Sequence, residues 1–208
     1  MITMYTGTPG SGKSVHLAKE MVFVLKKGKN VIANFEFNYE AVKSKKRGYF
    51  FQRENFELKV DWLVEFDELC HKKDRKGRTI ERQTYLVIDE CQLIFNARSW
   101  NDRDRQKWNW FFTQHRKKGY ELILVTQFDR LVDRQIRSLV EYEIKHRKVN
   151  NFGTGGLIVS LFTFGHPVFA CITYWYGVKE KCDVSFIMGR QKYYDLYDSY
   201  KMFDTADG

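Results

Sequence analysis

Residues 7–14 read GTPGSGKS, a run that indicates which fold to expect. The spacing G-x-x-x-x-G-K-S lets glycine backbone wrap closely around an anion, while the helix that follows directs its free N–H groups toward that anion. Lys13 is then expected to reach the β- and γ-phosphates of a nucleotide, and Ser14 to offer its hydroxyl to a Mg²⁺ ion on those phosphates. The alternative is a glycine-rich turn that matches by chance. The expected phosphate-binding residues are Gly7, Thr8, Gly10, Ser11, Gly12, Lys13, Ser14 and Val15.

The sequence on either side has the strand and the helix that such a loop requires. Residues 1–6, MITMYT, form a short strand-like run. After the loop, apolar residues recur at helical spacing until KKGKN, residues 26–30, ends the pattern. These apolar positions are Val15, Ala18, Met21, Val22 and Leu25.

Composition sets the outer limits. A chain of 208 residues that is 43% hydrophobic can bury a real core, so residues 1–208 are expected to form a single domain. The net charge of +9 favours an acidic partner such as nucleic acid or an anionic membrane, although an ordinary basic surface would carry the same charge. Four cysteines without a C-x-x-C pair, and no signal peptide, indicate a reducing cytoplasm. A zinc site at Cys70, His71 and Cys91 is disfavoured because Cys91 falls inside the next motif.

The second motif is YLVIDE, residues 85–90. Four apolar residues that run into two carboxylates indicate a buried parallel strand whose carboxyl end opens into a crevice. Asp89 is expected to hold the Mg²⁺, directly or through water. Glu90 points elsewhere and is expected to polarise the water that attacks the γ-phosphate. The simpler interpretation is a strand that ends in solvated acids.

A helix over 102–118 and a third strand follow. The helix is expected to present one face made of Trp108, Phe111, Phe112 and His115. The strand GYELILVTQ, residues 119–127, ends in Thr126 and Gln127. Gln127 is expected to sense the γ-phosphate, whereas the bland alternative is an amide that closes off the strand end. Together the motifs predict an α/β fold of the P-loop NTPase class. Its mainly parallel central sheet is flanked by helices and extended by antiparallel strands near the C-terminus.

Residues 150–178 contain no Asp, Glu, Lys or Arg and are long enough to span a membrane. The central GHP, residues 165–167, interrupts a membrane helix, and the segments 157–164 and 168–176 are rich in β-branched and aromatic residues. A soluble β-hairpin around GHP is therefore favoured. The preceding LVEYEIKHRKV, residues 139–149, alternates apolar and charged residues and predicts a half-exposed strand.

Three basic clusters point toward DNA: KSKKR at 43–47, KKDRKGR at 72–78 and HRKK at 115–118. Such loops can follow a phosphate backbone, with Tyr49, Phe50 or Trp100 available to stack on bases. Each cluster taken alone is equally typical of a solvated loop.

The order of GTPGSGKS, YLVIDECQLIF (85–95), residues 111–141 and YDLYDSY (194–200) resembles the zonular occludens toxin (Zot) domain of filamentous-phage assembly ATPases. The resemblance implies an ATPase that uses ATP and Mg²⁺ to export single-stranded phage DNA as the virion assembles. It implies partners among phage assembly proteins, a homo-oligomer such as a hexameric ring, and a place on the cytoplasmic face of the host inner membrane.

The catalytic set that the resemblance implies is Lys13, Glu90 and Gln127, together with an arginine that reaches a neighbour's γ-phosphate. Arg98, Arg116 and Arg137 lie in matching segments, and Arg116 is favoured because it ends the helix that leads to the Gln127 strand. Members of the family typically carry a transmembrane helix after this domain, so the chain is expected to be a cytoplasmic part of a longer anchored protein or a shorter relative. Two other functions stay open: a P-loop phosphotransferase with a small acceptor, and a nucleotide-dependent switch or toxin-like protein.

Overall fold

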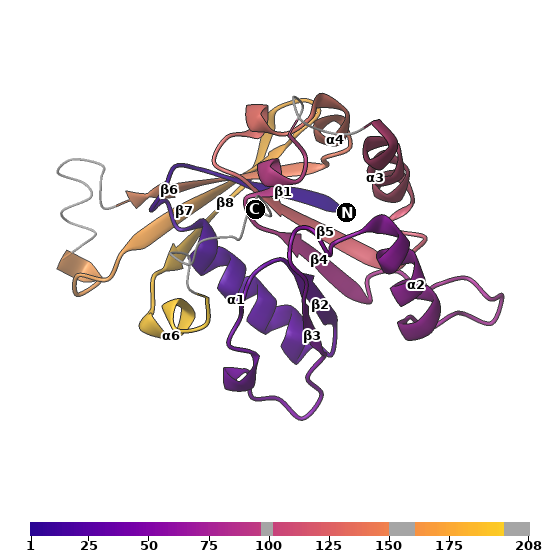
Figure 1. Ribbon diagram of the computed structural model, residues 1–208. Helices are drawn as coiled ribbons and strands as arrows, with labels where there is room; N and C mark the ends of the chain where they lie inside the picture. The colour runs from indigo at the N-terminus through magenta and orange to yellow at the C-terminus, as the bar shows by residue number, and fades with distance from the viewer. Residues whose placement is uncertain (97–101, 150–160, 198–208) are drawn as a thin grey trace, which may run out of the picture.

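The computed structural model describes residues 1–96, 102–149 and 161–197. One eight-stranded sheet runs through them in the order β3-β2-β4-β5-β1-β6-β7-β8 (Figure 1). The strands are β1 Ile2–Thr6, β2 Asn30–Ala33, β3 Phe50–Gln52, β4 Thr84–Ile88, β5 Tyr120–Val125, β6 Tyr142–Lys148, β7 Val168–Trp175 and β8 Glu180–Met188. The α-helices are α1 Lys13–Lys26, α2 Val60–Cys70, α3 Asp102–Gln114, α4 Arg134–Ser138 and α6 Gln191–Tyr194, and short 3-10 turns η1, η2 and η3 cover Tyr39–Ala41, Cys91–Leu93 and Asp129–Leu131.

The strands from β3 to β6 pair in parallel, whereas β7 and β8 add to β6 as antiparallel strands. This is the predicted P-loop α/β sheet with an antiparallel extension. β5 lies between β1 and β4, so the three strands that end in GTPGSGKS, Asp89–Glu90 and Thr126–Gln127 are adjacent. Parallel strands bring their carboxyl ends to one edge of the sheet, and all three predicted motifs therefore meet there.

Successive side chains on the central strands point to opposite faces of the sheet and pack into two separate hydrophobic cores. Met4, Leu86 and Leu124 pack with α2, α3 and α4 on one face. Their neighbours in sequence, Tyr5 and Val87 among them, pack with α1 and α6 on the other face (Figure 1). The apolar runs in these strands are continuous because both faces of the sheet are covered.

The two predicted helices are confirmed. α1 begins at Lys13 and ends at Lys26, and Gly28 follows in the left-handed conformation and donates its N–H to the Leu25 carbonyl. α3 ends at Gln114 and not at residue 118, because Gly119 turns the chain into β5. Its predicted face is buried: Trp108, Phe111, Phe112 and His115 are each at most 5% exposed.

The expected hairpin around GHP is wrong in its first half. Residues 161–164 form a helical turn where a strand was expected, and residues 150–160 lie outside the described residues. The second half, β7, is a strand, and its hairpin partner is β8. The aromatic composition of Leu161 to Phe164 suits a strand, but the Thr163 carbonyl accepts the His166 N–H and closes a turn instead.

β6 is a strand, as predicted, but its buried positions are polar. Glu143 and His146 are 7% and 2% exposed, and the Glu143 carboxylate accepts a hydrogen bond from the Thr6 hydroxyl at 2.7 Å. β6 can bury these groups because each has a hydrogen-bond partner. Across residues 1–96, 102–149 and 161–197, no helix has both the length and the apolar character that a bilayer crossing requires.

Candidate nucleotide-binding site

The loop between β1 and α1 needs glycine for reasons of space. Gly7 has φ +146°, and a Cβ there would lie 2.6 Å from Ser11 Oγ and 2.7 Å from the His146 carbonyl oxygen. Gly12 has φ +98°, and a Cβ there would lie 2.3 Å from the ring of Phe169. The backbone can therefore form a tight cradle only without side chains at these two positions. Ser11 Oγ is buried in this cradle without a hydrogen-bond partner among the described residues.

Lys13 folds back over the cradle. Its Nζ donates to the carbonyl oxygens of Gly7 at 2.7 Å and Thr8 at 3.3 Å. Burial lowers the pKa of this ammonium, and the nearby carboxylates of Asp89 and Glu90 oppose that shift. The ammonium thus lies next to the loop, in a position from which it can turn toward a bound anion.

Asp89 is held firmly at the carboxyl end of β4. Its backbone N–H donates to Asn34 Oδ1 at 2.7 Å, and its carbonyl accepts from Asn34 Nδ2 at 2.8 Å. The carboxylate accepts from the Glu90 N–H at 2.8 Å and from the Tyr197 hydroxyl. Burial raises the pKa of Asp89, while these two hydrogen bonds lower it. A positive ion beside this carboxylate would relieve the cost of burying its charge.

Glu90 has φ 44° and ψ 46°, the left-handed conformation that non-glycine residues rarely adopt. This conformation turns the chain sharply between the two acids. The Glu90 side chain accepts a hydrogen bond from Gln92 Nε2 and is partly exposed. Backbone strain of this kind clusters at functional sites, and here it occurs at the second of two adjacent carboxylates that line one cavity.

Gln127 joins β5 to the phosphate loop. Its carbonyl accepts the Gly7 N–H at 3.2 Å, and its partly exposed side chain faces the same cavity as Lys13. Because β5 lies between β1 and β4, Gln127 emerges between the glycine loop and the acidic pair.

These groups line one cavity of about 460 Å³. The predicted residues that line it are Gly10, Ser11, Gly12, Lys13, Ser14, Val15, Asp89, Glu90 and Gln127. Gly7 and Thr8 contribute backbone carbonyls to Lys13 at its base. The cradle, the helix N-terminus and the buried carboxylate fit a nucleoside triphosphate with a divalent cation.

The cavity also has a wall that sequence reasoning missed. It is made of Lys148, Pro167, Phe169, Tyr193, Tyr194 and Tyr197. Tyr197 is buried and donates to Asp89, 108 positions earlier in the chain. The motif YDLYDSY contributed to the family resemblance, but nothing in its local pattern indicates a partner so far away. Its repeated tyrosines were the available signal.

The candidate arginines do not line this cavity. Arg116 lies just before β5, at the amino edge of the sheet, where its guanidinium donates to Glu141 at 2.6 Å. It therefore lies across the sheet from the phosphate loop of its own chain. Arg137 lies in α4, 3.9 Å from Asp129. Arg98 falls outside the described residues.

The disfavoured zinc set of Cys70, His71 and Cys91 is not assembled. His71 directly follows α2 and its Nε2 lies 2.6 Å from the hydroxyl of Thr84, the first residue of β4, whereas Cys91 follows the other end of that strand. Cys70 is exposed.

Residues 1–202 match the family model described as zonular occludens toxin (Zot). The chain belongs to the Zot family. This match includes the strand–loop–helix, both later motifs and most of the segment that carries Tyr197.

Curated relatives include the Gene 1 proteins of several enterobacterial phages. The protein of phage M13 is 40% identical over 81 residues, which cover 38% of this chain and 23% of the relative. The protein of phage I2-2 is 30% identical over 130 residues, which cover 59% of this chain and 35% of the relative. The matches thus span about a quarter to a third of the relatives' length.

Solved structures share the fold at low identity. The N-terminal domain of zonular occludens toxin from Neisseria meningitidis has a TM-score of 0.55 at 19% identity, over 95% of this chain and 98% of that one. B204, the DNA-packaging ATPase from Sulfolobus turreted icosahedral virus, has a TM-score of 0.52 at 14% identity, over 89% and 95%. Both likenesses support the P-loop NTPase fold that the sheet order already indicates.

Proposed function

We propose that this chain is an ATP-hydrolysing, Mg²⁺-dependent motor that assembles a filamentous phage and exports its single-stranded DNA at the host inner membrane. The observation that carries the proposal is the cavity in which a glycine cradle, a buried Asp89 and a strained Glu90 meet. Membership of the Zot family supplies the biological setting, because the Gene 1 proteins of filamentous phages are relatives.

The residues of the cavity would have separate roles in phosphate binding, metal binding and catalysis. The loop N–H groups and Lys13 would hold the β- and γ-phosphates, and Ser14 and Asp89 would hold the metal. Bound Mg²⁺ would neutralise charge on the phosphates. Glu90 would accept a proton from water, and Gln127 would orient that water or report the γ-phosphate to the loop.

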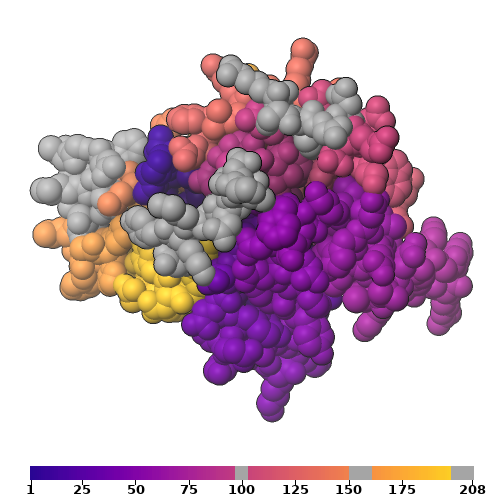
Figure 2. All heavy atoms as spheres, in the orientation of Figure 1, coloured from indigo at the N-terminus to yellow at the C-terminus, as the bar shows by residue number. Residues whose placement is uncertain are grey.

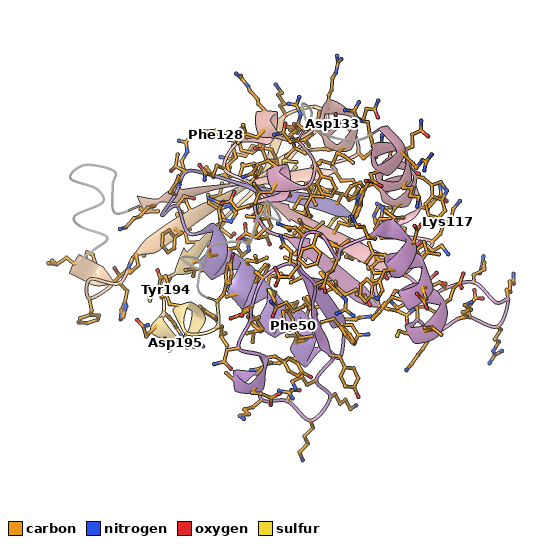
Figure 3. The ribbon with its side chains drawn as sticks, viewed as in Figure 1. Phe50, Lys117, Phe128, Asp133, Tyr194 and Asp195 are labelled. Carbon is orange, nitrogen blue, oxygen red and sulfur yellow. The ribbon has the colours of Figure 1, made fainter. Side chains whose placement is uncertain are left out.

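The three basic clusters supply a candidate DNA surface. They precede β3, β4 and β5, so they gather at the amino edge of the sheet, opposite the nucleotide cavity. Figures 1 and 2 show the loops before β3 and β4 projecting from the body of the molecule. In Figure 3, Lys117 of the third cluster and Tyr194 of the cavity wall lie at opposite sides of the view.

The clusters differ in how many free cations they offer. Arg47 packs on the Tyr39 ring at 3.7 Å and bonds two backbone carbonyls, and Lys118 pairs with Asp67 at 3.1 Å, so both have structural partners. The loop 72–78 keeps four exposed cations besides the ion-paired Arg78, namely Lys72, Lys73, Arg75 and Lys76. This loop is the strongest candidate for contact with a phosphate backbone.

The proposed motor is a homo-oligomer. Because the described arginines proposed for catalysis do not line their own cavity, one would act on a neighbour's nucleotide in a homo-oligomeric ring such as a hexamer, and Arg116 remains the proposed residue. Phage assembly proteins at the inner membrane are the proposed partners, and the proposed location is its cytoplasmic face.

The test is steady-state phosphate release from ATP across protein concentrations, with and without single-stranded DNA. A motor completed by a neighbour's arginine predicts turnover per chain that rises with concentration and with DNA. Lys13→Ala is expected to weaken nucleotide binding roughly 10- to 100-fold, the loss of one hydrogen bond to a charged group. Glu90→Gln is expected to keep binding and to lose roughly 10²- to 10⁴-fold in rate.

Lys19→Ala is the matched control, because Lys19 is an exposed lysine on α1 outside the cavity lining. Unchanged binding by Lys13→Ala would contradict the site. Unchanged hydrolysis by Glu90→Gln would contradict the catalytic assignment and favour a switch. ADP formation that requires a small acceptor, with the phosphoryl group recovered on that acceptor and not as free phosphate, would favour a phosphotransferase.

A further inference from the structure

We propose that His16, His146 and Cys171 form a zinc-binding site behind the phosphate loop. The three residues come from α1, β6 and β7. One ligand atom from each lies within 4.8 Å of the others. Two imidazoles and a thiolate form a donor set that suits Zn²⁺, and they leave a fourth position for water.

The imidazole of His146 is oriented as metal-bound histidines usually are. Its Nδ1 lies 3.1 Å from the Thr6 carbonyl oxygen and donates to it, so its Nε2 carries a lone pair. A backbone carbonyl behind the ring is a common second contact of zinc-bound histidine. Burial lowers the pKa of His146 to about 4, so this ring is neutral at neutral pH.

His16 faces the lone pair of His146. Its Nδ1 donates to His146 Nε2 at 2.8 Å, and its ring stacks on Tyr5 with centroids 4.7 Å apart. In a tetrahedral site the two nitrogens would lie about 3.3 Å apart, so they need to separate by about half an ångström. The His16 proton would move from Nδ1 to Nε2, which changes no charge.

Cys171 supplies the sulfur. Its side chain is fully buried, and burial raises the pKa of the thiol to about 11, so the thiol is protonated without metal. Binding would form the Zn–S bond, break the S–H bond and release one proton to solvent.

The position of this cluster gives the ion a role. His16 lies two residues after Ser14, the His146 carbonyl faces Gly7, and Phe169, two residues before Cys171, covers Gly12. Zinc would therefore tie together the helix and the two strands on which the phosphate cradle rests. Without zinc, the same residues would form a packed histidine pair.

The experiment titrates chelator-stripped protein, free of nucleotide and Mg²⁺, with Co²⁺ and then with Zn²⁺. We expect one Co²⁺ per chain with a thiolate-to-cobalt charge-transfer band, displacement by Zn²⁺, and release of one proton. Cys171→Ser is expected to abolish the band. Cys70→Ser and Cys182→Ser, which alter the two exposed thiols, are expected to keep it.

The zinc X-ray absorption spectrum of the unaltered protein tests the same ligands and does not depend on whether a variant folds. One sulfur and two imidazole nitrogens in the first shell are expected. A first shell without sulfur, binding of less than one ion per chain, or a charge-transfer band that survives Cys171→Ser would overturn the site. None of these readouts depends on ATP hydrolysis.

Discussion

At the scale of single residues, the contact between Tyr197 and Asp89 links the C-terminal segment to the candidate metal site. The Tyr197 hydroxyl occupies a carboxylate oxygen that Mg²⁺ would use, and its ring also packs on Phe35 with centroids 4.3 Å apart. One hydrogen bond therefore connects the candidate metal site to Tyr197.

The first prediction concerns Tyr197→Phe. The variant removes the competing hydroxyl and keeps the ring contact, so the fold is expected to be unchanged. In the variant, Mg²⁺ no longer competes with the Tyr197 hydroxyl for the Asp89 carboxylate. A hydrogen bond to a charged group is worth roughly 1.5 to 3 kcal/mol. The Mg²⁺ concentration for half-maximal nucleotide binding is expected to fall roughly 10- to 100-fold in a fluorescence titration. A higher requirement would contradict the competition.

The second prediction concerns His115, which is buried just after α3. Burial lowers its pKa to about 4, and its Nδ1 donates to the Phe112 carbonyl. The unfolded chain, with an ordinary histidine pKa of about 6.5, binds more protons between these values, so stability falls as the pH drops through that window.

His115→Gln keeps a donor and removes the titration. Chemical unfolding of chelator-treated protein at pH 7 and pH 5 is the measurement. The loss of unfolding free energy between these pH values is expected to be smaller in the variant by roughly 1 to 2 kcal/mol. An equal loss in both proteins would show that His115 titrates normally.

At the scale of elements, α3 offers a third prediction with a control on the same helix. Phe111 is fully buried between Trp108 and Tyr120, whereas Trp110 is 47% exposed. Phe111→Ala is expected to cost about 3 to 5 kcal/mol of unfolding free energy, because it removes apolar contacts and leaves a cavity. Trp110→Ala is expected to cost under about 1 kcal/mol in denaturant titrations. Similar costs would mean that α3 is not anchored by this face.

At the scale of the whole molecule, the amino edge of the sheet carries the fourth prediction. Replacing Lys73, Arg75 and Lys76 with Gln is expected to weaken single-stranded DNA binding. The slope of log binding constant against log salt concentration is expected to become shallower by up to about 2, because each phosphate contact contributes about 0.7. Anisotropy titrations at several salt concentrations measure both quantities.

The matched control replaces Lys19, Arg190 and Lys192, three exposed cations away from that edge. It makes the same change in net charge, so a diffuse electrostatic effect would weaken binding equally in both variants. An equal loss of DNA binding in the two variants would therefore contradict a specific contact between the loop 72–78 and DNA.

Sequence patterns suffice to predict the phosphate loop, α1, the buried face of α3 and the strands that end in Asp89 and Gln127. Each of these is encoded by neighbouring residues, through glycine spacing or apolar periodicity, so local chemistry suffices. The strand predicted at residues 161–164 was wrong, because residues with strand-like composition can be closed into a turn by a neighbouring hydrogen bond.

Four features emerge only when the chain folds. They are the strand order, the hydrogen bond from Tyr197 to Asp89, the proximity of His16, His146 and Cys171, and the place of Arg116 across the sheet from its own cavity. Each depends on residues far apart in the chain, which the pairing of strands brings together. β7 lies beside β6, for example, and sets Cys171 against His146. Such pairing depends on the packing of both sheet faces at once, which no local pattern contains.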